Sequence, residues 1–142
     1  MIRPADAEDK ERVRGLFREY AEGLDVSLDF QSFDDELVDP LAFYEVVLFD
    51  EDGCVALRRI DAETCEMKRL YVRPSARGTG LGRRLAEAVV AEARGRGYRR
   101  MLLDTIPSMA AAQGLYASLG FRETGPYRHN PVPGALFLEL RL

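Results

Sequence analysis

The spacing of hydrophobic positions predicts both helices and strands in the first half of the chain. Apolar residues recur every three or four positions between residues 8 and 22, which is typical of an amphipathic helix. Residues 30–37 predict a short acidic helix or loop that ends before Pro40, because a proline disfavours helix at the preceding residue. Residues 45–49 and 54–59 predict two strands, and the Asp-Glu-Asp-Gly sequence between them is typical of a hairpin turn.

The second half alternates strands and helices. The pattern predicts strands over residues 64–72 and 99–104, helices over 80–96 and 109–119, and final strands over 121–127 and 135–140. Glycine follows the end of each helix, as it commonly does. The alternation in the middle and the hairpins at both ends predict an α/β (α+β) fold, with a mixed sheet and helices on both faces. A chain of 142 residues is expected to form a single domain, residues 1–142.

Composition and charge narrow the functional classes. Hydrophobic residues make up 46% of the chain and charged residues 31%, as in globular proteins. The formal charge of −4 argues against general nucleic-acid binding, and no apolar run reaches the length of a membrane span. The N-terminus lacks the apolar core of a signal peptide. Cys54 and Cys65 have neither metal-ligand nor disulfide spacing, so we expect two small core residues in a reducing cytoplasm, and no metal site.

The segment from Arg77 to Gly82, Arg-Gly-Thr-Gly-Leu-Gly, is the clearest candidate for a binding site. It joins the strand predicted at 64–72 to the helix that follows. Its glycines leave backbone N–H groups uncovered, at a helix start where the first N–H groups have no intrahelical partner and the helix dipole adds positive charge. Arg83 and Arg84 add two cations nearby. Such a loop suits a pyrophosphate, so we expect a phosphate-bearing cofactor here.

Three kinds of glycine-rich phosphate loop can be compared with this segment. A Walker A loop needs Gly-Lys-Ser/Thr, whereas Gly82 is followed by two arginines, which excludes it. A dinucleotide loop needs G-x-G-x-x-G and the glycines here run G-x-G-x-G, although Asp104 stands about where a ribose-binding acid is expected. The third pattern, Arg/Gln-x-x-Gly-x-Gly/Ala, is satisfied by Arg77, Gly80 and Gly82. An ordinary glycine-rich turn stays open as the alternative without a ligand.

Around this third pattern the chain resembles the GNAT superfamily of acetyl-CoA-dependent N-acetyltransferases. Four motifs carry the resemblance in the family's order: the Ile-Arg-Pro-Ala start at residues 2–5, the strand 66–74 that enters the loop, the strand 99–104, and Leu-Tyr-x-x-x-Gly-Phe at 115–121. The resemblance covers nearly the whole chain. It implies a mostly antiparallel central sheet whose two central strands splay apart, with acetyl-CoA as cosubstrate.

The resemblance also implies which residues bind acetyl-CoA. Main-chain atoms of Leu70, Tyr71 and Val72 would bind the pantetheine arm. The loop would hold the pyrophosphate through Arg77, Gly78, Thr79, Gly80, Leu81, Gly82 and Arg83. At the start of the helix that follows the next strand, many members carry an asparagine that binds the pantetheine arm, and Met109 stands in its place here.

Two residues are candidates for proton transfer. Tyr116 matches the tyrosine that many members use as general acid, and a phenol with a pKa of about 10 can protonate a departing thiolate. Alternatively, Tyr116 has no catalytic role and is an amphipathic tyrosine that packs in the core. Glu66 lies where some members place a general base, and desolvation would raise its pKa toward that task. Its alternatives are a solvated glutamate near Lys68, with an ordered water as the base.

The resemblance implies that the acceptor is an amine, carried by a small molecule or a protein, and the sequence does not fix it further. Residues 24–44 and 126–134 correspond to the segments that vary in the family, and they would shape the acceptor pocket. The first segment carries acids that would favour cationic amines or form a solvated face: Asp25, Asp29, Asp34, Asp35 and Glu36. Phe30, Phe33 and Tyr44 would line the pocket or pack in the core. His129, between the two final strands, is a candidate for acceptor binding or a solvated loop residue. A homodimer is compatible with this reading. The alternative functions are a CoA-binding sensor without turnover and a dinucleotide-dependent oxidoreductase.

Overall fold

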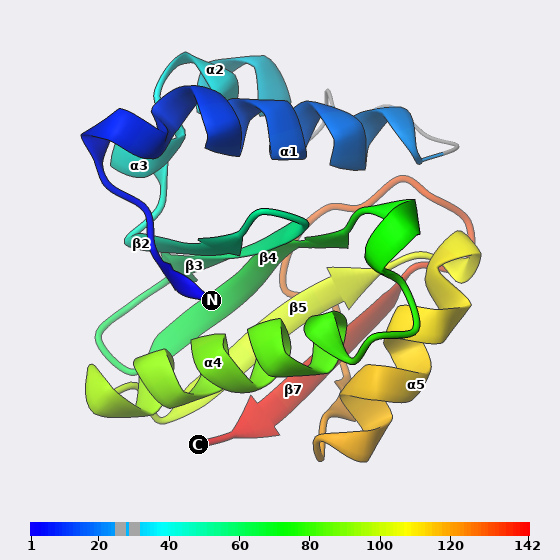
Figure 1. The fold of residues 1–142 in the computed structure, drawn as a ribbon. Helices are drawn as coiled ribbons and strands as arrows, with labels where there is room; N and C mark the ends of the chain where they lie inside the picture. Colours follow the sequence, from blue (N-terminus) through cyan, green and yellow to red (C-terminus); the bar gives the residue numbers. More distant parts are fainter. Residues whose placement is uncertain (25–27, 29–31) are drawn as a thin grey trace.

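The structure is a computed structural model of the 142-residue chain that describes residues 1–24, 28 and 32–142 (Figure 1). Its strands are β1 Arg3–Pro4, β2 Val46–Asp50, β3 Gly53–Arg59, β4 Thr64–Val72, β5 Arg100–Thr105, β6 Arg122–Thr124 and β7 Leu136–Arg141. They form one seven-stranded sheet in the order β1-β2-β3-β4-β5-β7-β6. Its neighbouring strands are antiparallel except for β4 and β5, which are parallel. The expected mixed, mostly antiparallel sheet is thereby confirmed.

The helices lie on both faces of this sheet, as the sequence predicts. They are α1 Lys10–Glu22, α2 Phe33–Val38, α3 Pro40–Phe43, α4 Leu81–Gly95 and α5 Ala110–Ser118. In Figure 1, α1, α2 and α3 lie over one face, and α4 and α5 lie on the other side. None of the helices in the described part of the chain is both long and apolar enough to cross a membrane.

Each face of the sheet has its own apolar cluster. On the α1 face, Val13, Leu16 and Phe17 pack with strand residues of β2 and β3. On the α4 face, the helix residues Leu85 and Val89 pack with residues of β4, β5 and β7. Cys54 belongs to the first cluster and Cys65 to the second, and both are buried free thiols. Their predicted role as small core residues is confirmed.

Two short elements were not expected from the sequence. β1 has only two residues, too few to produce a hydrophobic alternation, and pairs with β2. α3 begins at Pro40, where the sequence predicted an end: proline is tolerated in the first helical turn, and the Asp39 side chain accepts a hydrogen bond from the Ala42 backbone N–H. β6 is also shorter than the strand predicted at 121–127. These differences lie away from the central strands.

The central strands β4 and β5 separate partway along their length. They pair only at the three positions that begin with Thr64 opposite Arg100 and end with Glu66 opposite Leu102. Beyond that point β4 continues to Val72 beside β3 alone, and a register shift occurs where Ala56 pairs with Lys68 but Cys54 pairs with Tyr71. Arg69 lies in this bulge with a φ of 58°, in the left-handed region that a non-glycine residue seldom adopts. The predicted splay of the central strands is therefore present.

Candidate active site

The glycine loop joins β4 to α4 with two residues in left-handed conformation. Gly78 has φ 82° and Gly80 has φ 86°, and Gly80 precedes α4 without any side chain capping the helix. A Cβ built on Gly78 would meet nothing within 4 Å, so the loop leaves open space on that side of the backbone. The Thr79 hydroxyl donates to the Ala76 carbonyl at 2.6 Å, which fixes the turn. The loop thus presents an uncapped helix start with open space, the geometry expected of an anion site.

A groove of about 560 Å³ runs along this loop. Of the cofactor-binding residues predicted from the sequence, it is lined by Leu70, Tyr71, Val72, Arg77, Gly78, Gly80, Leu81 and Gly82. Thr79 and Arg83 do not line it: the Thr79 hydroxyl faces the loop backbone, and Arg83 donates to the Ser118 hydroxyl at 2.6 Å. The opposite wall comes from α5 and the turn before it, including Ser108, Met109 and Ala112. One continuous groove therefore brings the end of β4, the loop and α5 together.

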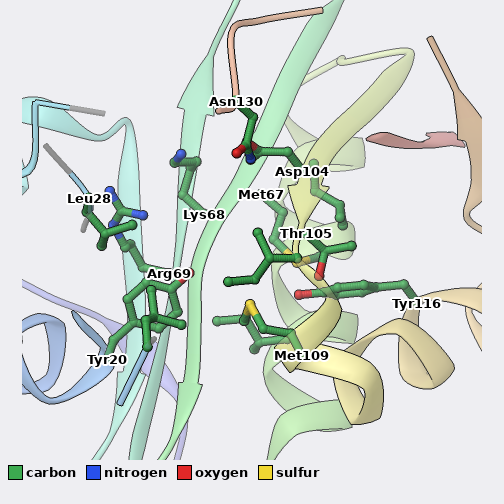
Figure 2. A pocket seen from close by; sticks show the side chains of 14 residues that line it. Tyr20, Leu28, Met67, Lys68, Arg69, Asp104, Thr105, Met109, Tyr116 and Asn130 are labelled. Atoms are coloured by element: carbon green, nitrogen blue, oxygen red, sulfur yellow. The ribbon is translucent and has the colours of Figure 1, made fainter. Parts of the chain in front are cut away.

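A smaller chamber of about 40 Å³ adjoins the groove where β4 and β5 have separated. The groove and the chamber share four lining residues: Tyr20, Leu24, Leu70 and Met109. Tyr116 lines the chamber, and Figure 2 shows its phenol reaching from α5 toward the space between the strands. Burial raises the pKa of Tyr116, so the phenol is protonated at neutral pH. Tyr116 therefore holds an available proton at the far end of the groove.

The chamber opens between side chains that lie on opposite faces of the sheet. Lys68 pairs with Ala56, which belongs to the apolar cluster on the α1 face, whereas Leu103 belongs to the cluster on the α4 face. Because strand side chains alternate, Asp104 lies on the α1 face with Lys68, and Thr105 lies on the α4 face, where Tyr116 packs. The four polar residues Lys68, Asp104, Thr105 and Tyr116 all line the chamber. One face thus supplies an acid and a lysine, and the other supplies two hydroxyl groups.

Glu66 lies on β4 just before the strands separate, and it lines neither cavity. Its side chain is fully buried, which rules out the solvated alternative. Its Oε1 accepts a hydrogen bond from Arg58 at 3.2 Å, and its Oε2 accepts from Arg128 at 3.2 Å and from the Tyr127 hydroxyl. Glu66 thus anchors the segment after β6 to the central strand. Its predicted role as general base stays a prediction, and any proton must reach it past these donors.

Glu36 is not one of the solvated or acceptor-facing acids that the sequence suggested. It is fully buried and forms a two-bond ion pair with Arg69: Nε donates to Oε2 and Nη2 to Oε1, both at 2.8 Å. The Arg69 guanidinium also lies over the rings of Tyr20 and Phe33, at 5.4 and 5.2 Å from their centroids. The pair fastens α2 to the bulge of β4 that precedes the groove residue Leu70. Asp34 and Asp35 are exposed, while Asp25, Asp29 and Phe30 lie outside the described residues.

Other sequence expectations have mixed outcomes. Phe33 and Tyr44 are buried in the cluster on the α1 face, which favours packing over pocket lining. Met109 lines both cavities with an apolar side chain, where the resemblance led us to expect a hydrogen-bonding asparagine in other members. His129 is exposed and lines neither cavity. The groups that sequence reasoning missed at the chamber are Lys68, Thr105 and Asn130. Thr105 ends the apolar strand β5 and Asn130 lies in a loop, whereas Lys68 lies in the middle of β4 among other charged residues.

Comparison with known proteins agrees with this geometry. Residues 11–121 match the Acetyltransferase (GNAT) family. An uncharacterized N-acetyltransferase of Schizosaccharomyces pombe is 38% identical over 98% of the chain and 90% of its own length. The crystal structure of an acetyltransferase of Streptococcus agalactiae has a TM-score of 0.79 at 21% identity, covering 100% of this chain and 98% of that one. A putative acetyltransferase of Salmonella typhimurium, solved with its cofactor acetyl-CoA, has a TM-score of 0.72 at 23% identity over 99% and 92%.

Proposed function

Because the chain belongs to the GNAT acetyltransferase family, we propose that this N-acetyltransferase moves an acetyl group from acetyl-CoA to a primary amine by direct transfer in a ternary complex. One observation carries the proposal. The groove along the glycine loop shares a wall with the chamber that contains the Tyr116 phenol. A ligand whose pyrophosphate binds at the loop can therefore extend its other end toward a protonated phenol.

The residues of the groove fit acetyl-CoA. The uncapped start of α4 offers backbone N–H groups and the positive end of the helix dipole to a pyrophosphate. Arg77 lines the same part of the groove and adds a cation. Beyond the bulge at Arg69, the free edge of β4 at Leu70, Tyr71 and Val72 faces the groove, where its backbone groups would bind the amide-bearing pantetheine arm. Acetyl-CoA supplies the activated acetyl thioester, and that the Salmonella typhimurium structure contains acetyl-CoA supports the assignment.

The protein's own residues then handle protons at the chamber. We assign Tyr116 as the general acid that donates its phenolic proton to the departing sulfur; burial raises the pKa of this phenol, and the same burial would raise that of a thiol formed in the chamber. Glu66 is the proposed base, as the sequence suggested. Since its carboxylate oxygens already accept hydrogen bonds from Arg58, Tyr127 and Arg128, the proton from the amine would pass through a hydrogen-bonded neighbour or a water. The acceptor amine belongs to a small molecule or a protein.

Amine-dependent release of CoA tests the proposal. The purified protein is incubated with acetyl-CoA and a panel of primary amines, and free thiol is measured alongside the acetylated product by mass spectrometry. Calorimetry measures the affinity for acetyl-CoA in parallel. Amine-dependent thiol release is expected. Tight binding of acetyl-CoA without release for any amine would favour a sensor, and an increase in melting temperature with NAD but not with CoA would favour an oxidoreductase.

A further inference from the structure

Asp104 lines the chamber and has no part in the mechanism proposed above. It lies on β5 beyond the last residue that pairs with β4, so its side chain borders the opening between the strands. Its Oδ2 accepts a hydrogen bond from the Asn130 amide at 3.0 Å, and none of the described residues donates one to its Oδ1. The side-chain oxygen of Asn130, Oδ1, in turn accepts a hydrogen bond from the Val132 backbone N–H at 3.0 Å. One oxygen of the carboxylate is thus held in place, and the other is available to a ligand.

The chamber contains a second polar group that could form a hydrogen bond with a ligand. Thr105 is 2% exposed, and its hydroxyl has no hydrogen-bond partner among the described residues. A buried hydroxyl without a partner costs free energy, which a ligand with a hydrogen-bonding atom would recover. A volume of about 40 Å³ holds one amino group or one water. Thr105 and Asp104 therefore make the chamber a small polar site rather than an apolar void.

Asp104 is the acid among the residues that line the chamber, alongside the cations Lys68 and Arg69, and the Arg69 guanidinium is paired with Glu36. Asp104 and Tyr116 lie on opposite faces of the sheet, so a group between them would meet the carboxylate on one side and the phenol on the other (Figure 2). Glu66 shares the face of Asp104, but its three donors occupy it and it does not line the chamber. Lys68 lies on that face too: burial and then the charges of Arg69 and Arg128 lower the pKa of its ammonium, whereas Glu66 and Asp104 raise it. Asp104 is therefore the acid on this face that an entering group can reach.

We propose that Asp104, oriented by Asn130, binds the ammonium group of the acceptor, so that this acetyltransferase selects amines that are cationic at neutral pH. The inference rests on the proposed function, because it gives the substrate class of the same site. Asp104 determines specificity in this scheme: it holds the nitrogen beside the chamber in its ammonium form. Removal of the proton and departure of the thiol are left to the groups assigned above.

The test compares pairs of probes that have the same shape but differ in charge. Ethylamine and phenethylamine are cationic at pH 7, whereas their alkoxyamine counterparts, O-methylhydroxylamine and O-benzylhydroxylamine, are largely neutral. Affinity is measured by calorimetry with the protein saturated with CoA, which permits binding without reaction. The same pairs are measured as acceptors of acetyl-CoA through kcat/KM.

Asp104→Asn keeps the shape of the side chain and removes its charge. For the pair that the wild type binds, the variant should weaken binding of the cationic member by about tenfold or more while changing that of the neutral member little. Asn130→Ala should produce a smaller loss for the same member. Asp35→Asn, which removes an exposed acid of α2, should leave both probes unchanged. Affinity for acetyl-CoA should be preserved in all three variants.

Three outcomes would overturn the inference. They are a wild type that prefers the neutral member, a wild type that binds neither member, and an Asp104→Asn variant in which the ratio of the two affinities is unchanged. Binding and turnover separate this inference from the proposed function. Selective ammonium binding without thiol release would support the site and contradict the enzyme, whereas thiol release without charge selectivity would do the reverse.

Discussion

Replacing Glu36 with alanine should destabilise the fold far more than an ordinary Glu→Ala substitution. The Glu36 and Arg69 side chains are 0% and 1% exposed and share two hydrogen bonds of 2.8 Å. The variant leaves a guanidinium buried against the rings of Tyr20 and Phe33 without its carboxylate. In the wild type burial lowers the pKa of Arg69, and the hydrogen bonds and charge of Glu36 more than offset this. Without Glu36 the guanidinium still keeps its proton, because the ordinary pKa of arginine lies far above neutral.

The expected loss of stability follows from the burial of this ion pair. Removing one partner of a buried ion pair costs about 3–5 kcal/mol, because the remaining charge stays desolvated. For a domain of this size each kcal/mol lowers the melting temperature by about 2–4 °C, so a decrease of roughly 10 °C is expected. Arg69 also lies in the bulge that precedes Leu70, so the variant should bind acetyl-CoA more weakly under conditions in which it is still folded.

Urea unfolding and thermal melts measure the effect, with Glu63→Ala as the matched control. Glu63 pairs with Arg99 at 3.8 Å on the surface, where the side chains are 66% and 79% exposed, so its loss should cost less than about 1 kcal/mol. In a double-mutant cycle, Arg69→Ala should cost much less in the Glu36→Ala background than in the wild type. A Glu36→Ala cost similar to that of Glu63→Ala, or additive costs in the cycle, would refute the reasoning.

Four further predictions concern the site. Gly80→Asp should abolish acetyl-CoA binding with the fold retained, because a carboxylate at a residue with φ 86° repels the pyrophosphate at the start of α4; unchanged affinity by calorimetry would contradict the anion site. Tyr116→Phe should keep acetyl-CoA affinity and lower kcat by about ten- to a thousand-fold, and an equal kcat where chemistry limits the rate would return Tyr116 to a packing role. Glu66→Gln should flatten the rising limb of kcat/KM against pH; a limb identical to that of the wild type would leave Glu66 only the role of anchoring Tyr127 and Arg128. Burial, and then the charge of Arg69, lowers the pKa of Lys68 from 10.5 to about 8, so the unfolded chain binds this proton more tightly. The unfolding free energy of the wild type should therefore rise relative to that of Lys68→Met between about pH 8 and pH 10.5, and parallel curves in urea unfolding would contradict this.

Local pattern was sufficient to predict most of the secondary structure and the position of the glycine loop. The strand predicted at 64–72 is β4 to the residue, because apolar alternation and flanking turns act over a few residues. The glycines at 78 and 80 are needed for positive φ, a requirement that the sequence expresses directly. Elements of two to four residues, such as β1 and α3, lack enough positions to show a period, and the sequence did not reveal them.

The fate of each charged side chain was decided only by the tertiary structure. In sequence nothing distinguishes the roles of the three acids Glu36, Glu66 and Asp104. In the structure Glu36 forms a buried pair with a residue 33 positions away, and Glu66 accepts hydrogen bonds from residues 61 and 62 positions away. Asp104 keeps an oxygen open to the chamber because β5 leaves β4 just before it. Burial and pairing depend on which distant segments the fold brings together, and the spacing of residues along one strand carries no record of that. The sequence therefore determined the family, most of the secondary structure and the position of the glycine loop, whereas the surroundings of its acids came from contacts between segments remote in the chain.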